Sequence, residues 1–108
     1  MQYVNESFRN QRVELDGKMF RNCEFENCEL VFSGDRPPTF SDNRFVDTVF
    51  VLTGEATRTM YLLSNLYHAG EGGKEVVENI FDDIRNRRVH GHEIHTKVPN
   101  TRDHSLAG

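Results

Sequence analysis

A large apolar residue recurs at every fifth position through the first half of the chain. The series holds Leu15, Phe20, Phe25, Leu30, Phe40, Phe45 and Phe50, and Asp35 interrupts it. Five of the eight phenylalanines fall in this series. A fixed period of this kind indicates stacked structural units and constrains the fold more strongly than any local pattern.

A longer period of twenty residues lies on top of the first. Residues 30–35, Leu-Val-Phe-Ser-Gly-Asp, recur in kind at 50–55 as Phe-Val-Leu-Thr-Gly-Glu. Twenty is four fives, which suggests a coil of four short sides stacked on the coil before it and joined to it by backbone hydrogen bonds. Such stacking places Phe20 on Phe40, Phe25 on Phe45 and Leu30 on Phe50.

Each unit of five has a second inward position. In an extended segment, residues two apart face the same side, so the residue two positions before each large residue also faces the core. Two residues before each large residue stand mostly small side chains, namely Val13, Lys18, Cys23, Cys28, Pro38, Asn43 and Thr48. Units such as Cys-Glu-Phe-Glu-Asn at 23–27 resemble those of the pentapeptide-repeat family. The resemblance covers about residues 13–54 and implies a right-handed quadrilateral β-helix, with residues 33–38 as a loop. A small β-meander is the alternative, because 23–26 also alternate like an ordinary half-buried strand.

After Gly54 the apolar spacing becomes helical. It predicts one helix over about 55–68 and, after a glycine-rich break at 69–73, a second over about 74–87. A short solenoid needs a cover for its last coil, and this hairpin is the candidate. We therefore predict a mainly β fold with α: about two coils over 8–54 capped by a helical hairpin over 55–88. Together they form a single domain, 1–88, followed by a polar, flexible tail over 89–108.

The predicted core combines the series of five with two inward cysteines. It comprises Leu15, Phe20, Cys23, Phe25, Cys28, Leu30, Phe40, Phe45 and Phe50. Free cysteine packs as a small hydrophobic residue, and two cysteines five residues apart fit neither a disulfide scaffold nor the usual zinc spacing. We expect both thiols to be buried, reduced and unligated.

Composition narrows the class of protein. Apolar residues make up 36% of the chain, no apolar run is long enough to span a membrane, and the charged start lacks a secretion signal. A soluble, cytoplasmic protein is expected. Residues 85–108 carry five basic and two acidic groups, which leaves eight and fifteen for residues 1–84. The body is acidic and the tail basic, and we expect no direct nucleic-acid binding.

Two groups of residues are candidate ligand sites. Arg36, Arg44 and Arg58 would receive an anion if the loop folds toward the start of the first helix. His90, His92 and His95 offer three imidazoles for a metal ion, although their spacing fits no zinc signature. Solvated arginines and a tail with incidental histidines are the simpler interpretations. Gly70–Lys74 lacks the Ser or Thr and the first glycine of a phosphate loop.

No catalytic motif is present, and we expect no cofactor. The acidic residues of the repeat point outward, where burial cannot tune their pKa. The leading hypothesis is a small non-enzymatic protein-binding module, and the alternative is a binder of a small anion or a metal. Because the predicted helices have wider apolar faces than one solenoid end covers, we also expect a homodimer with the hairpin in its interface.

Overall fold

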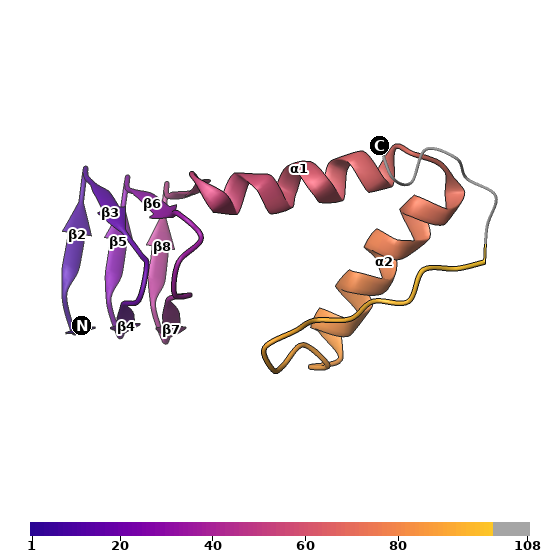
Figure 1. Ribbon diagram of the computed structural model, residues 1–108. Helices are drawn as coiled ribbons and strands as arrows, with labels where there is room; N and C mark the ends of the chain where they lie inside the picture. The colour runs from indigo at the N-terminus through magenta and orange to yellow at the C-terminus, as the bar shows by residue number, and fades with distance from the viewer. Residues whose placement is uncertain (101–108) are drawn as a thin grey trace. The chain divides into compact units, whose positions relative to one another are not determined.

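The computed structural model describes residues 1–100, with nine strands and two helices (Figure 1). The chain forms two compact units, Met1–Thr59 and a second that begins at Met60. The elements, in chain order, are β1 (Gln2–Val4), β2 (Ser7–Arg9), β3 (Arg12–Glu14), β4 (Met19–Arg21), β5 (Glu24–Glu26), β6 (Glu29–Phe32), β7 (Thr39–Ser41), β8 (Arg44–Val46), β9 (Val49–Leu52), α1 (Glu55–Tyr67) and α2 (Glu71–Arg85).

The strands form three parallel sheets of three strands each, with orders β1-β4-β7, β2-β5-β8 and β3-β6-β9. Every third strand joins the same sheet, so the chain visits three sheets in turn and then returns one layer further. Figure 1 shows one such stack, β2, β5 and β8, side by side. This topology is β-helix-like. The alternative of a β-meander is wrong, because a meander pairs consecutive strands antiparallel.

The predicted stacking of layers is confirmed. Phe20 pairs with Phe40, Phe25 with Phe45, and Leu30 with Phe50 in the strand register. The rings of Phe20 and Phe40 lie 5.6 Å apart and 13° from parallel, and those of Phe25 and Phe45 lie 5.3 Å apart and 6° from parallel. The twenty-residue period therefore measures one full turn of the chain.

There are three layers rather than the two predicted. Strands β1–β3 form a first layer in which Tyr3, Phe8 and Val13 pair with Phe20, Phe25 and Leu30. Val13, predicted only as the small inward residue two positions before Leu15, is the strand residue that pairs with Leu30, and Leu15 is buried as expected. The connection from the first layer to the second spans seven residues, from Val13 to Phe20, which is not a multiple of five. The connection from the second layer to the third spans ten, from Leu30 to Phe40, so the period of five continues across it.

Asparagine and aspartate turn the corners between strands. Six corner residues have a positive φ between 48° and 57°, and each lies two positions after a central aromatic: Asn5, Asn10, Asn22, Asn27, Asp42 and Asp47. Asn and Asp tolerate this left-handed conformation better than other non-glycine residues. The side chains also form ladders, in which Asn22 Nδ2 donates to Asn5 Oδ1 at 2.7 Å and Asn27 Nδ2 to Asn10 Oδ1 at 2.8 Å.

The core is the middle of the stack. Leu15, Phe20, Cys23, Phe25, Cys28 and Leu30 are all buried, as predicted. Phe40, Phe45 and Phe50 were placed in the core as well, but they are 37%, 42% and 61% exposed. They belong to the last layer of strands, so each ring has a neighbouring layer on one side only.

The loop predicted over 33–38 is confirmed, and Asp16 holds it in place. The Asp16 carboxylate accepts hydrogen bonds from the Ser33 amide at 3.0 Å, the Ser33 hydroxyl at 2.7 Å and the Asp35 amide at 2.9 Å. The hydrogen bond from the Ser33 amide is the main reason why the pKa of Asp16 lies below its usual 3.8. Gly34, with φ of +98°, brings the loop against the first turn of α1.

Both predicted helices are present. Helix α1 ends at Tyr67, one residue earlier than predicted, and α2 begins at Glu71 rather than 74. Gly72 and Gly73 therefore lie in the first turn of α2, where both are buried together with Val76 and Val77. Packing outweighs the low helix propensity of glycine here. In residues 1–100 no helix has the length and hydropathy needed to cross a membrane.

Residues 86–100 follow α2 without a further helix or strand, and most of their side chains are exposed. This agrees with the polar tail predicted from residue 89. The part of that tail over 101–108 lies outside the described residues.

Candidate functional site

The last layer of strands, β7 to β9, presents three aromatic rings. We call Phe40, Phe45 and Phe50 the terminal triad. Their centroids lie 5.8, 5.9 and 6.1 Å apart, so the rings form a compact triangle. Phe40 and Phe45 each use one face to stack on the preceding layer. Rings this exposed on a small protein are typical of an interaction surface.

The backbone of the same layer has open hydrogen-bond donors. In the two preceding layers the corner amides donate to the next layer, as Asn10 N does to Glu26 O at 3.0 Å and Asn27 N to Val46 O at 2.9 Å. Within residues 1–100 the corresponding amides of Asp42 and Asp47 have no such acceptor. An open strand edge of this kind pairs readily with another strand.

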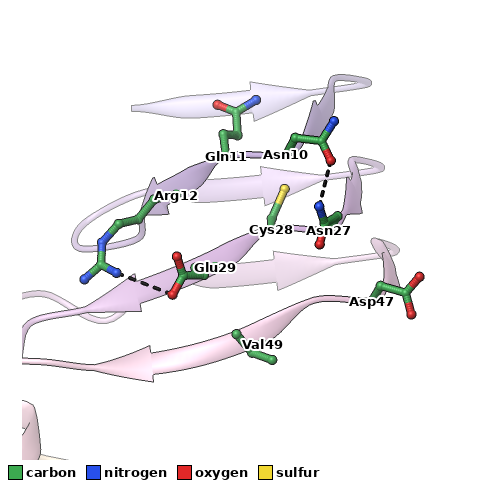
Figure 2. A pocket seen from close by; sticks show the side chains of 8 residues that line it. All are labelled: Asn10, Gln11, Arg12, Asn27, Cys28, Glu29, Asp47 and Val49. Carbon is green, nitrogen blue, oxygen red and sulfur yellow. Dashed lines mark hydrogen bonds and ion pairs between the residues drawn. The ribbon is translucent and has the colours of Figure 1, made fainter.

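A first hollow, of about 440 Å³, lies on the corner between the β2-β5-β8 and β3-β6-β9 sheets (Figure 2). Its lining is mostly polar. Arg12 Nη1 lies 3.5 Å from Glu29 Oε2, and the neutral side chain of Asn27 donates to Asn10 Oδ1 at 2.8 Å. The Cys28 Sγ lies 3.3 Å from both the Phe8 and the Glu26 carbonyl oxygens, so its single S–H can donate to either. These pairings belong to the repeat, because they join equivalent positions of successive layers.

The two cysteines have the positions predicted for them. Both are free in the structure and 2% exposed. Each sulfur lies within 3.5 Å of two backbone carbonyl oxygens, of Tyr3 and Arg21 for Cys23 and of Phe8 and Glu26 for Cys28. Their burial is confirmed, while their redox state and the absence of a ligand in solution stay predictions.

A second hollow, of about 320 Å³, lies beside the connections between layers. It is lined by Met1, Gln2, Gly17, Lys18, Met19, Arg36, Pro37 and Thr39. Among these residues the only charged side chains are Lys18 and Arg36. Neither takes part in an ion pair within residues 1–100.

The three arginines predicted to share an anion lie on three different elements. Arg36 is in the loop before β7, Arg44 is on β8 opposite Glu24, and Arg58 is in α1. The hollow that holds Arg36 includes neither Arg44 nor Arg58. Its second cation is Lys18, which the repeat identified only as the residue two positions before Phe20 and not as part of an anion site.

The three histidines lie in the segment after α2. His95 Nε2 is 3.1 Å from Glu93 Oε1, and both side chains are 82% exposed. No group of three or more His, Cys, Asp or Glu side chains in residues 1–100 is placed to hold a metal ion. A metal site at His90, His92 and His95 therefore stays a prediction that the geometry does not support.

Comparison with protein-family models, curated proteins and solved structures gives no significant match. The likeness to the pentapeptide-repeat family consequently stands on the repeat and on the sheet topology alone. No residue role is transferred from another protein.

Proposed function

We propose that this chain is a right-handed quadrilateral β-helix of the pentapeptide-repeat type and acts as a non-enzymatic protein interaction module in the cytoplasm. The observation that carries the proposal is the last layer, where the terminal triad coincides with an open strand edge. The aromatic rings offer apolar contact area, and the open amides offer hydrogen bonds that fix the orientation of a partner strand. Complexes in which a strand is added to a sheet edge use the same combination.

A second copy of the chain is the occupant that this surface fits. A two-fold axis perpendicular to the stacking direction, passing through the middle of β8, reverses strand direction and sets β8 against its own copy. The same operation sets β7 against β9. Phe45 then meets Phe45 of the second copy, and Phe40 meets Phe50, so every ring of the terminal triad gains a neighbour. Such a contact is isologous, as in most homodimers.

In the proposed dimer the second copy, rather than the helical hairpin, covers the last layer of strands. The second copy completes the last layer, and the hairpin contributes apolar surface of its own to the dimer. Tyr61 and Leu62 of α1 are 69% and 56% exposed, which gives them area to contribute. The lateral faces of the sheets carry ion pairs such as Arg9–Glu26 at 3.2 Å, which keep those faces solvated.

Light scattering tests the proposal directly. The native chain is expected at twice its 12.5 kDa mass at micromolar concentration. Phe50→Lys should return the mass to that of a monomer, because it places a charge among the rings. Ile94→Lys is the matched control, since Ile94 is 63% exposed and lies after α2, and it should leave the dimer intact.

Circular dichroism shows whether the Phe50→Lys variant keeps its fold, and Phe50 is suitable because 61% of it is already exposed. A native chain that scatters as a monomer would refute the homodimer. A folded Phe50→Lys variant that remains dimeric would refute the terminal triad as its interface.

A further inference from the structure

We propose that the hollow beside Lys18 and Arg36 binds a phosphate group, either free or as a phosphomonoester. The site is separate from the terminal triad, so it stands independently of the interaction function. Its lining joins two cations to the neutral polar side chains of Gln2 and Thr39.

Backbone hydrogen bonds between successive layers bring the two cations together. Gly17 N donates to Arg36 O at 2.7 Å, and Thr39 N donates to Lys18 O at 3.0 Å. Gly17 adopts a left-handed φ of +70°, and a Cβ added to it would lie 3.8 Å from the Arg36 Cβ. Pro37 fixes its own φ directly after Arg36. The connections over 15–18 and 33–38 are thus held side by side, although the cations are eighteen positions apart in the sequence.

The local charge favours an anion, although the chain as a whole does not. The net charge is −4, so general attraction cannot concentrate anions on this protein. The hollow itself contains no carboxylate. Asp16 and Asp35 are the nearest acidic residues in sequence, and neither lines the hollow. The Asp16 carboxylate stays charged, but it faces Ser33 and the Asp35 amide, from which it accepts three hydrogen bonds.

The chemistry of the two cations selects phosphate. A guanidinium donates two parallel hydrogen bonds to a tetrahedral oxyanion, and an ammonium adds a point charge. Two cations match the charge of a phosphate near its dianionic state. The Thr39 hydroxyl supplies a neutral donor, and Met19 and Pro37 offer apolar surface for the organic part of a phosphomonoester.

An NMR titration with ¹⁵N-labelled full-length protein tests the site. Inorganic phosphate and phenyl phosphate are added in separate arms, with sodium chloride at matched ionic strength and sodium acetate as further arms. Saturable shifts are expected at the amides of Gly17, Lys18 and Thr39 with both phosphates. Arg36→Gln and Lys18→Gln should each weaken binding about tenfold, because each removes a hydrogen-bonded charge.

Arg44→Gln is the matched control, since it removes one exposed arginine elsewhere in the same unit and should leave the affinity unchanged. Tighter binding of phenyl phosphate than of inorganic phosphate would identify a phosphomonoester as the ligand class, and equal binding would identify the free ion. The site is refuted if chloride gives the same shifts, if Arg44→Gln weakens binding as much as Arg36→Gln, or if a folded Arg36→Gln variant binds normally. Equal binding of acetate would refute the choice of phosphate.

Discussion

Among Gly17, Gly34, Gly54 and Gly91, an added methyl group would meet the closest neighbours at Gly34, and we expect it to cost the most stability there. Its φ is +98°, and a Cβ built there lies 2.7 Å from the Ala56 backbone nitrogen and 3.0 Å from the Glu55 Cβ. The Ala56 nitrogen already donates to Thr53 O at 3.1 Å. The Gly34→Ala change therefore forces either the loop or the first turn of α1 to shift.

The cost has two separable parts. Holding alanine at positive φ costs about 1–2 kcal/mol. Displacing backbone that is too close adds about 1–3 kcal/mol, the range found for overpacking. Gly17→Ala isolates the first part, because Gly17 has φ of +70° and its added Cβ would meet only the Arg36 Cβ, at an ordinary 3.8 Å. We expect Gly34→Ala to lower the free energy of unfolding by about 3 kcal/mol and Gly17→Ala by about 1 kcal/mol.

Urea unfolding followed by circular dichroism measures both changes under identical conditions. A domain of this size has a free energy of unfolding of about 5–15 kcal/mol, so both variants should remain folded enough for a complete transition. The urea dependence should keep the native slope, because the surface exposed on unfolding is unchanged. If Gly34→Ala proves no less stable than Gly17→Ala, the loop does not approach α1 as closely as described, and the reasoning fails.

Two further predictions concern carboxylates. Asp47→Asn should raise the free energy of unfolding in urea by about 0.5–1 kcal/mol, because an amide there has the donor needed to extend the Asn10–Asn27 ladder. Asp35→Asn is the control, since it removes the same charge outside the ladder. An equal gain from Asp35→Asn would show that the lost charge, and not the ladder, raises the stability. Because the folded pKa of Asp16 is lowered, its contribution is complete above the usual value of 3.8 and is lost as pH falls through the folded pKa. Stability measured from pH 7 to 2 should therefore fall more steeply below about pH 4 for the native chain than for Asp16→Asn, and parallel curves would contradict the assigned role.

Side-chain spacing alone defines the middle and last layers, so both could be predicted from the sequence. Phe20, Phe25 and Leu30 repeat at intervals of five, and their twenty-residue offset from the next layer is directly visible. The first layer was missed because the connection after Val13 shifts the phase by two residues. The corner residues carried the missing signal, since an Asn or Asp follows the central aromatic of the first two strands by two positions in every layer.

The candidate sites were less predictable, for a physical reason. Lys18 and Arg36 share a hollow only because two loops of unequal length are joined by hydrogen bonds, and loop length leaves no periodic trace in the sequence. The exposure of Phe50 could not be predicted either. Inward residues have the same spacing of five in a layer that is covered on both sides and in the last layer. Periodicity identifies which face a side chain occupies, but it does not show whether another layer follows.

The proposal that a partner binds at one end of the stack depends on what distinguishes the last layer from the other two. In the middle layer each strand has a partner on both sides, so its backbone groups and rings are satisfied within the chain. In the first layer Tyr3 and Phe8 are half-buried, and their rings lie in edge contact at 5.6 Å. The last layer differs from both, because its rings are exposed and its corners carry Asp42 and Asp47, which cannot continue an amide ladder. The open amides and ring faces of this layer have no further layer within the described residues. The proposed second copy would supply strands for these amides and rings for these ring faces, although it pairs antiparallel where the layers of one chain pair parallel.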